Sequence, residues 1–432
     1  MMNVLVIGAG GVGESICALF DRRKNADKWL GKVVLADYDF EKAKEAAAKQ
    51  RNKDRFIAEQ VDALKKEDLV RLARKYEIGY MVHCLVTEGF TSVIMEACLE
   101  CNCHFVDMAL TETLRDPDDP TVIIQELGHE EFLKSKAFEE KGLYAMVGCG
   151  VEPGMVDYFA RFAEKHFFDE IEELHVRDGS NLRHPTNELV FGFSVATTLM
   201  ECLYGPHLYD YEKGIYSAEP LTLTEEFWLP GGIGMTRMSA VEHSEPFNMS
   251  QHIKGLKKAD FKIGYGQDFE DAMKYLKQLG LLSNRKVILR GKEVKPVDLL
   301  VDLLGAVSPE PKKIGQELVG KTCAGLWVVG RKDGMERQVY IYQVADNQEC
   351  IEKYGTPAVV AQTAVVPAII VELTAKGEME GPFGVRLSEE FNPMPVLELL
   401  EEYEFPAGVL EMESEYREKI EREQFKQPFS NV

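Results

Sequence analysis

Short apolar runs alternate with longer amphipathic segments over the first third of the chain. Apolar runs at 3–7, 32–36, 55–60, 79–85, 103–107 and 143–147 are typical of buried strands. The segments between them have apolar positions at helical spacing, at 13–23, 39–50, 64–75, 89–101 and 129–141. Strands and helices that alternate in this way build a parallel sheet with crossover helices on both faces. The pattern predicts an α/β fold with a doubly wound parallel sheet over residues 1–150.

The pattern changes near residue 150. Glycine and proline from Gly148 to Gly154 interrupt the periodicity, and a new helix is predicted from Met155. Further strands are predicted at 171–180, 190–197, 235–247 and 258–265, together with a hairpin over 323–343 that turns at Asp333-Gly334. Helices are predicted at 356–376, interrupted by Pro367, at 393–403 and at 412–427. The sequence after residue 150 therefore predicts strands of a second sheet followed by C-terminal helices.

The first predicted strand runs directly into a glycine-rich turn, Gly8-Ala9-Gly10-Gly11-Val12-Gly13, with a helix predicted to follow. A G-x-G-x-x-G motif between a strand and a helix is the dinucleotide-binding fingerprint of the Rossmann fold. Gly8 permits the tight turn, Gly10 lets the backbone approach a diphosphate, and Gly13 lets helix and strand pack together. The start of the helix would direct free N–H groups at the diphosphate. The alternative is a glycine-rich turn that binds no ligand.

The second predicted strand ends at Asp37, where a carboxylate accepts hydrogen bonds from the adenosine ribose and repels a 2′-phosphate. No arginine follows closely, so we expect NAD rather than NADP. The alternative role for Asp37 is to cap the helix predicted from Phe40. Asp62 follows the third strand, at the adenine side. Cys84 and Leu85 end the fourth strand, at the nicotinamide side, and we expect all three residues to line the cofactor site.

Composition narrows the classes of partner. The 432 residues are too many for one ordinary core, so two or three domains are expected. The formal net charge of −22 argues against nucleic acid and anionic membranes, because both need a basic face. The longest apolar stretch, 358–373, contains Gln362, Thr363 and Pro367, and we judge it too short and too polar to span a bilayer.

Nine cysteines, an odd number, and the absence of a secretory signal before the first strand predict a cytoplasmic protein with reduced thiols. Cys98, Cys101, Cys103 and His104 are residue types that bind zinc. No second ligand pair follows them at zinc-finger spacing, so no metal site is predicted.

Further segments follow the glycine motif in a recognisable order. They are 80–85, 105–107, 150–156, 241–246, 262–266, 332–334, 355–357 and 384–385. In this order and spacing the chain resembles the saccharopine dehydrogenase-like family. That family includes saccharopine reductases, lysine 6-dehydrogenases, carboxynorspermidine dehydrogenases and, more distantly, homospermidine synthases.

The resemblance implies an N-terminal Rossmann domain (1–150), a central α+β domain for substrate binding and dimerisation (151–354), and C-terminal helices that return to the first domain (355–432). It also implies an NAD-dependent oxidoreductase, commonly a homodimer, that acts on a carbon–nitrogen bond. The expected substrate is an amine, either an amino acid or a polyamine. Phe193-Ser194 stands where homospermidine synthases often have Trp-Ser, and Glu152 where polyamine-type members often have Asn.

Amine oxidation or imine reduction needs a carboxylate or an imidazole near the nitrogen. Our catalytic candidates are Asp107 at a strand end, Glu152 before Pro153-Gly154, and His243 on a predicted strand, where it would shuttle protons near neutral pH. Glu242 is a candidate for substrate binding, and Arg177 for clamping a substrate carboxylate. The alternatives are a capping carboxylate for Asp107, a turn residue for Glu152, a satisfied or exposed histidine for His243, and a surface ion pair for Arg177.

Two other functions fit the same residues. One is a transferase of the homospermidine synthase type, in which NAD is reduced and reoxidised within each cycle. Phe193 argues mildly against it, because phenylalanine is a weaker cation–π platform for an ammonium group than tryptophan. The other is a protein that binds NAD without catalysis.

Overall fold

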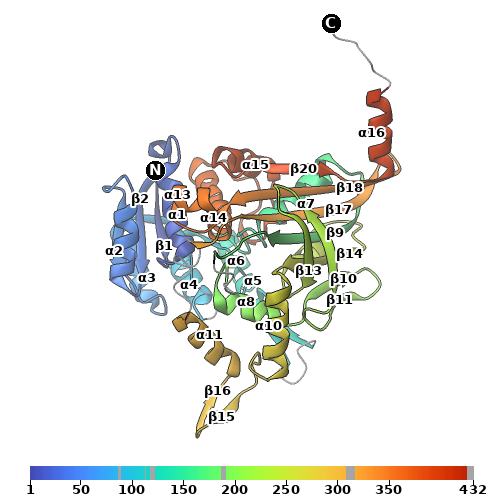
Figure 1. Cartoon of the computed structure of the whole chain (residues 1–432). Coiled ribbons are helices and arrows are strands. Elements are labelled where there is room, and N and C mark those ends of the chain that lie inside the picture. The colour runs from blue at the N-terminus through green and yellow to red at the C-terminus, as the bar shows by residue number, and fades with distance from the viewer. Residues whose placement is uncertain (86–88, 112, 117–121, 186–190, 308–316, 426–432) are drawn as a thin grey trace.

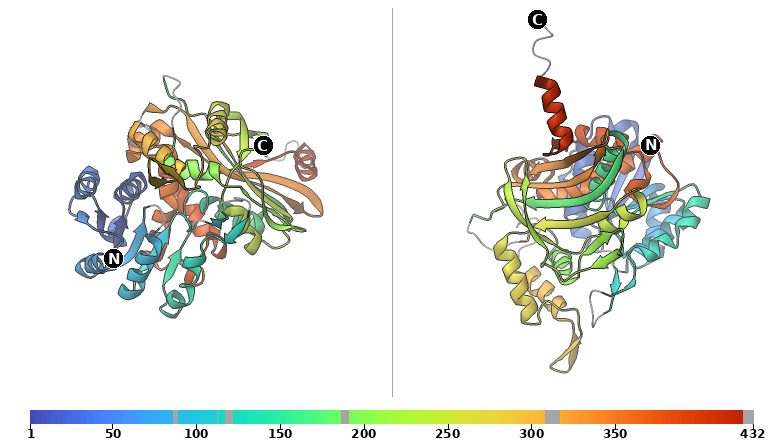
Figure 2. Two further views of the ribbon diagram at one scale, coloured as in Figure 1. Left: turned by 90° about the horizontal axis from the view of Figure 1, so that it is seen from below. Right: turned by 90° about the vertical axis from the view of Figure 1, so that its right-hand side faces the viewer.

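The computed structural model describes residues 1–85, 89–111, 113–116, 122–185, 191–307 and 317–425. Two β-sheets dominate it, and helix α14 (Ala358–Lys376) lies between them (Figure 1). Figure 2 shows the strands of the second sheet in front of the N-terminal domain when the molecule is seen from its right-hand side.

The first sheet is parallel and has seven strands, which confirms the predicted doubly wound fold. Its strand order is β19 (Gly384–Arg386), β8 (Tyr144–Met146), β5 (His104–Asp107), β4 (Ile78–His83), β1 (Met2–Ile7), β2 (Leu30–Asp37) and β3 (Phe56–Gln60). The chain order reverses between β1 and β4, which is where such sheets bind their ligands, at the carboxyl ends of the strands.

The helices of this domain follow the predicted spacing. They are α1 (Gly11–Arg22), α2 (Phe40–Lys49), α3 (Lys66–Tyr76), α4 (Thr91–Cys101), α5 (His129–Phe132) and α6 (Ser135–Glu140). In α2 the buried positions Ala43, Ala46 and Ala47 are three and four residues apart, so they share one helix face. The single helix predicted at 129–141 is two short helices, and a small hairpin, β6 (Leu114–Arg115) and β7 (Ile123–Gln125), precedes them.

The second sheet is mixed and has nine strands. Its main order is β11 (Gly214–Ser217), β10 (His207–Asp210), β14 (Lys258–Gly264), β9 (Glu170–Ser180), β17 (Lys321–Lys332), β18 (Met335–Asp346) and β20 (Ala407–Glu411), and β13 (Gly234–Ala240) joins β14 to β12 (Thr224–Leu229). β9 and β14 are parallel, whereas β17 and β18 form the predicted antiparallel hairpin. Asp333 and Gly334 both have positive φ there, as a tight two-residue turn requires.

Two predicted strands differ from the structure, the first in all of its described residues and the second in its later half. Of the strand predicted at 190–197, residue 190 lies outside the described residues. Ser194 caps helix α8 (Val195–Leu203) by accepting the Thr197 N–H at 3.3 Å. The strand predicted at 235–247 ends as β13 at Ala240, and helix α9 (Glu245–His252) begins at Glu245 with proline in its first turn. An early proline and a capping serine are helix-start signals, and here they outweigh the apolar run.

Helix α14 corrects two expectations about its segment. The helix continues through Pro367, and it is long and apolar enough to cross a membrane by length and composition. However, 78% of its most apolar window is buried inside the protein. α14 packs against α1 of the first domain, so its apolar character is that of a core helix. Helices α13 (Asn347–Tyr354), α15 (Pro393–Glu402) and α16 (Glu415–Phe425) flank it in the sequence.

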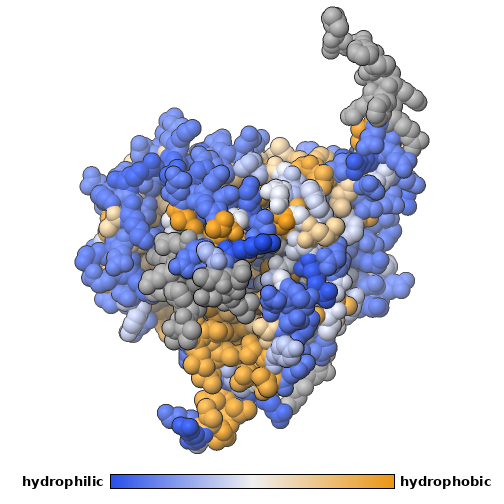
Figure 3. All heavy atoms as spheres, viewed as in Figure 1, coloured by the Kyte–Doolittle hydropathy of each residue, from blue (hydrophilic) through white to orange (hydrophobic). Residues whose placement is uncertain are grey.

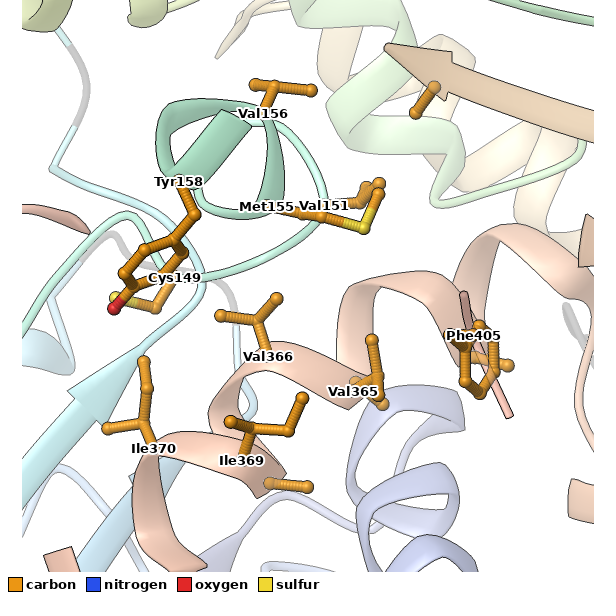
Figure 4. Close-up of a cluster of buried hydrophobic side chains, with 14 of the residues drawn as sticks. Cys149, Val151, Met155, Val156, Tyr158, Val365, Val366, Ile369, Ile370 and Phe405 are labelled. Atoms are coloured by element: carbon orange, nitrogen blue, oxygen red, sulfur yellow. The ribbon is translucent and has the colours of Figure 1, made fainter. Parts of the chain in front are cut away.

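A shared apolar core joins the two domains beside the start of helix α7 (Met155–His166). Figure 4 shows Cys149 and Val151, from the segment before α7, facing Val366 and Ile370 of α14. All four side chains are buried. This core fixes the turn that carries Glu152 against the C-terminal helices.

Candidate active site

The glycine turn after β1 has the geometry that only glycine permits. Gly8 has a φ of +107°, and a Cβ placed on it would lie 2.8 Å from the Cys84 carbonyl oxygen. A Cβ on Gly13 would lie 2.0 Å from the Gly8 carbonyl oxygen. Both distances are far below van der Waals contact, so these two glycines hold β1, β4 and α1 together.

The same turn fits a dinucleotide diphosphate. A Cβ on Gly10 would meet nothing within 4 Å, so this part of the backbone is open to close approach. Helix α1 begins at Gly11, which leaves the N–H groups of Gly11, Val12 and Gly13 without partners inside the helix. Free N–H groups and the positive end of a helix dipole are the standard protein site for a phosphate group.

Asp37 is fixed to the glycine turn. Its Oδ2 accepts the Ala9 N–H at 2.7 Å, and its Oδ1 accepts the Asp39 N–H at 2.9 Å. Helix α2 is capped by Asp39, whose side chain accepts the Glu41 N–H, so Asp37 does not serve as that cap. The Asp37 carboxylate stands at the carboxyl end of β2, next to the turn, where an adenosine ribose would lie.

The other predicted cofactor residues follow neighbouring strands. Cys84 and Leu85 come directly after β4, and both would contact a Cβ on Gly8. Asp62 lies two residues after β3, where its carboxylate pairs with Lys65 Nζ at 2.9 Å. The structure thus brings the glycine turn together with Asp37, Cys84 and Leu85, and it places Asp62 farther along the same sheet edge.

Asp107, at the end of β5, is committed to partners within its own domain. It is buried, its Oδ2 lies 2.5 Å from Nδ1 of His83, and its Oδ1 accepts the Ala109 N–H at 3.1 Å. The Thr91 hydroxyl also donates to it, at 3.4 Å. These contacts match the alternative role that the sequence allowed, a carboxylate that caps the turn after its strand.

Across the domain junction lies a group of four acidic side chains that we call the acidic cluster: Glu152, Asp178, Glu201 and Glu245. Glu152 precedes α7, Asp178 is on β9, Glu201 on α8, and Glu245 begins α9. His243 lies between two of them. Its Nδ1 is 3.2 Å from a carboxylate oxygen of Glu245, and its Nε2 is 3.7 Å from Glu201.

His243 lies in the loop between β13 and α9, not on a strand as predicted. Its ring stacks on Phe261 with a centroid separation of 3.6 Å and an interplanar angle of 8°. Burial alone would lower the pKa of His243, but Glu245 and Glu201 outweigh burial and raise it to about 10. His243 is therefore an imidazolium at neutral pH, which corrects the prediction that it shuttles protons in that range.

The carboxyl groups of Glu152 and Asp178 are close enough to share a hydrogen bond, which requires one of them to carry a proton. Burial and the charge of Asp178 raise the pKa of Glu152 well above its ordinary value. Burial also raises the pKa of Asp178. Oε2 of Glu152 is buried and has no hydrogen-bond partner among the residues that the structure describes. Such an atom is costly unless a ligand satisfies it.

The turn that carries Glu152 is hydrogen bonded to the cofactor edge of the first sheet. The Cys149 N–H donates to the carbonyl oxygen of Asp107 at 2.9 Å, and the Gly154 N–H donates to Asp157 at 2.6 Å. Glu152 therefore follows the carboxyl end of β8 and lies beyond the strand that ends at Asp107. The acidic cluster is consequently next to the side of the sheet where a nicotinamide ring would lie.

Arg177 lies apart from the acidic cluster, whereas Glu242 borders it. Arg177 neighbours Asp178 on β9, and successive strand residues point to opposite faces. Its guanidinium group pairs with Asp260 at 2.7 Å and with Glu225, which leaves it committed to the protein rather than to a substrate carboxylate. A carboxylate oxygen of Glu242 lies 3.3 Å from Nδ1 of His207, and the Glu242 N–H donates to the Glu201 carbonyl oxygen at 3.2 Å.

The sequence analysis missed three members of the acidic cluster as site residues. Asp178, Glu201 and Glu245 were not among the candidate residues. The phenol of Tyr265, after β14, donates to Glu201 and was also missed. Glu245, two residues after His243, was the one member with a local signal. Among the described residues, no group of three histidine, cysteine, aspartate or glutamate side chains is arranged to hold a metal ion.

Comparisons with known proteins identify the family. The family model described as saccharopine dehydrogenase NADP binding domain matches residues 4–146, and the model of the saccharopine dehydrogenase C-terminal domain matches residues 150–405. The solved structure of apo saccharopine dehydrogenase (L-Glu forming) from Saccharomyces cerevisiae shares the fold, with a TM-score of 0.70 and 13% identity over 96% of this chain and 100% of that chain.

Two curated relatives are similar over nearly their whole length. The carboxynorspermidine synthase of Vibrio alginolyticus is 30% identical over 92% of this chain and 94% of its own. The carboxyaminopropylagmatine dehydrogenase of Synechocystis sp. is 26% identical over 94% of this chain and 97% of its own. Together with the glycine turn and the two-domain fold, these matches show that the chain belongs to the saccharopine dehydrogenase family and is a nicotinamide-dependent oxidoreductase.

Proposed function

We propose that the protein interconverts an amine and an imine in a carboxylated polyamine, with NAD(H) as the cofactor. The relatives named after carboxynorspermidine and carboxyaminopropylagmatine support this substrate class. The observation that carries the proposal is the acidic cluster at the domain junction, where His243 is the one cationic side chain paired with it among the described residues. A buried excess of carboxylates favours a cationic ligand, because ammonium groups neutralise them.

Glu152 and Asp178 would bind the reacting nitrogen. When NAD is bound, its nicotinamide ring supplies or takes up the hydride. In the oxidative direction the substrate carbon loses a hydride and the nitrogen loses a proton, which the ionised carboxylate of Glu152 accepts. In the reductive direction Glu152, protonated because of its raised pKa, returns that proton to the nitrogen. His243 remains charged, and its positive charge favours the ionised form of the carboxyl groups beside it.

The cofactor preference rests on Asp37. Its carboxylate stands where an adenosine ribose would lie, and it would repel a 2′-phosphate. We therefore propose NAD, although the matching family model is named for NADP. Calorimetric titration tests this point: NAD should bind more tightly than NADP, and Asp37→Ser should weaken NAD binding roughly tenfold or more, because hydrogen bonds to charged groups contribute about 1.5–3 kcal/mol. Tighter binding of NADP by the unaltered protein would refute the preference.

The reaction is tested by following NADH absorbance with purified protein and NAD. Carboxynorspermidine and carboxyaminopropylagmatine are the substrates to try, with saccharopine and lysine as comparisons. We expect turnover with at least one of the first two. NAD binding without turnover on any of the four compounds would favour a non-catalytic protein. Formation of a new polyamine without net NADH would favour the transferase alternative.

We also propose that the protein is a cytoplasmic homodimer. All nine cysteines are free thiols, which suits a reducing compartment. Microscopy of a tagged chain in its native cell tests the location, and light scattering on the purified protein tests the mass.

A further inference from the structure

A hairpin and a helix project together from the body of the second domain. The hairpin consists of β15 (Val287–Leu289) and β16 (Lys292–Val294), which pair only with each other, and helix α11 (Pro296–Val307) follows it. Figure 1 shows both at the lower end of the molecule, with the hairpin at the tip. Val297 and Leu300 of α11 are buried, and the helix packs against α8. We call this unit, residues 285–304, the arm.

The arm exposes apolar side chains that a globular protein normally covers. Ile288 at the hairpin is 71% exposed, and its neighbours Val287 and Leu289 are 43% and 50% exposed. On α11, Leu299 and Leu303 are 39% and 51% exposed. Figure 3 shows these elements as a continuous apolar area between polar surfaces. Exposed apolar areas of this kind mark contact surfaces.

The charges of the arm divide into two complementary parts. Five basic residues and one acidic residue lie between Arg285 and Lys295, in a chain whose formal net charge is −22. The exposed side of α11 is acidic instead, because Asp298 and Asp302 adjoin the two exposed leucines. Asp298 and Asp302 are four residues apart, and so are Leu299 and Leu303. Both pairs therefore run along one side of the helix. The hairpin is thus apolar and basic, and α11 is apolar and acidic.

We propose that the arm binds a second copy of this chain, with the hairpin of each copy lying on the exposed side of α11 in the other; this assignment rests on the homodimer proposed above and names its interface. The contact is self-complementary, as a two-fold interface requires, because each chain presents both halves. It would cover the leucines and isoleucine of both arms and pair the basic hairpin with Asp298 and Asp302. The acidic side of α11 and the chain's negative charge disfavour an anionic membrane or a nucleic acid as the occupant.

The proposed interface is one helix away from the acidic cluster. α11 packs on α8, and α8 carries Glu201, one of the carboxylates that flank His243. Asn284, just before the hairpin, donates to the Tyr204 hydroxyl at the end of α8 at 3.4 Å. Pairing of two arms would therefore hold α8 in place from its outer side.

Light scattering after size exclusion measures the mass without any substrate or cofactor, so the outcome is independent of the proposed reaction. The unaltered protein should have twice the 48.7 kDa mass of one chain. Ile288→Glu and Leu303→Lys should each give the mass of a single chain, because each places a charge against a like charge in the partner. Leu133→Glu, at a residue 72% exposed in the first domain, is the matched control and should leave the mass doubled.

A charge exchange makes the test specific. Asp298→Lys with Asp302→Lys should give single chains, and adding Lys292→Glu with Arg290→Glu should restore the doubled mass. Circular dichroism confirms that each variant is folded, which is expected because all four positions are exposed. The proposal is overturned if the unaltered protein is a single chain, if the arm variants leave its mass unchanged, or if the arm instead binds vesicles of anionic lipid in an Ile288-dependent way.

Discussion

The two faces of β9 carry charge in opposite ways. On one face Arg177 and His175 lie with Lys262 of β14 among the carboxylates of Asp260, Glu225 and Glu173, so each cation has an anionic partner. On the other face Asp178 joins the acidic cluster, in which His243 is the paired cation. Arg177 and Asp178, which lie on opposite faces, are consecutive residues of the strand.

The difference appears in the protonation of each face. Burial would raise the pKa of Asp260, but Arg177 and His175 hold it well below its ordinary value. Burial raises the pKa of Glu152 and of Asp178, and the nearby cation does not reverse the effect. Balanced buried charge serves structure, whereas unbalanced buried charge has to be completed by a proton or a ligand. The site is therefore recognised as the place where buried carboxylates outnumber the cations paired with them.

Removing a carboxyl group from the acidic cluster should abolish activity while leaving the fold intact. In Glu152→Gln, kcat/KM should fall about 10²- to 10⁴-fold, the usual contribution of a positioned acid or base. The melting temperature should stay the same or rise, since a buried carboxyl pair is relieved. Steady-state kinetics and thermal unfolding measure the two effects. Glu173→Gln, on the opposite face of β9, is the matched control, and an equal loss of activity there would remove the distinction.

We call the face of β9 that carries Arg177 the balanced face. Removing a cation from it should reduce stability rather than activity. Arg177→Met leaves Asp260 and Glu225 without their buried partner, which should lower the free energy of unfolding by about 3–5 kcal/mol. Urea denaturation measures the loss. Lys44→Met, which removes a solvent-exposed pair with Glu41, is the control and should change stability by about 0.5 kcal/mol or less. If Arg177→Met retains full stability but loses substrate affinity, Arg177 belongs to the site after all.

The protein should become less stable at alkaline pH, because the folded state holds protons on His243, Glu152 and Asp178. The raised pKa of His243 contributes stability that is complete below about 6.5 and is lost as the pH rises towards about 10. Glu152 and Asp178 act in the same direction, because the folded state holds protons that the unfolded chain releases. Melting temperature should therefore fall between pH 6.5 and pH 9.5. The melting temperature of the His243→Gln variant should fall less steeply over this range. A melting temperature of the unaltered protein that rises over this range would contradict the assigned protonation.

The smallest expected effect concerns the phenol of Tyr265. Tyr265→Phe removes one hydrogen bond to Glu201, so KM for the amine should rise roughly threefold to tenfold, in line with about 0.5–1.5 kcal/mol for one hydrogen bond. Stability should be nearly unchanged. Lys262→Met on the balanced face should leave KM unaltered and reduce stability. Kinetics and urea denaturation of the two variants, measured side by side, would sharpen the contrast between the faces.

Periodicity and glycine spacing were sufficient to predict six strands of the first sheet, because the information for a βαβ unit is local, but not the seventh, β19, which comes from residues 384–386. The glycine turn and Asp37 belong to one such unit, and the structure brings them together as expected. Helix α8 was missed because its apolar residues follow one another closely, and only the Ser194 cap distinguishes it from a strand. A capping serine therefore has to be weighed against an apolar run when the start of a helix is predicted.

The acidic cluster was largely beyond the sequence, because its members meet across long separations. Glu152 and His243 were selected, but their partners Asp178 and Glu201 come from other elements, and strand pairing decides which face Asp178 occupies. Arg177 was selected and its neighbour Asp178 was not, and the pleat of β9 places the two on opposite faces. The protonation of His243 depends on these partners, so its pKa was not available from its neighbours in the chain.

Strand β19 has a consequence for how the chain is made. Residues 384–386 pair with β8, and the Gly384 N–H donates to the Leu143 carbonyl oxygen at 2.9 Å. During synthesis the glycine turn leaves the ribosome before the strands of the second sheet, while the edge strand β19 of its own sheet leaves after β18. Until then β8 presents an uncovered edge, which is a template for unwanted pairing with other chains. The first domain of a nascent chain is therefore completed only after strands β9 to β18 of the second sheet have been made.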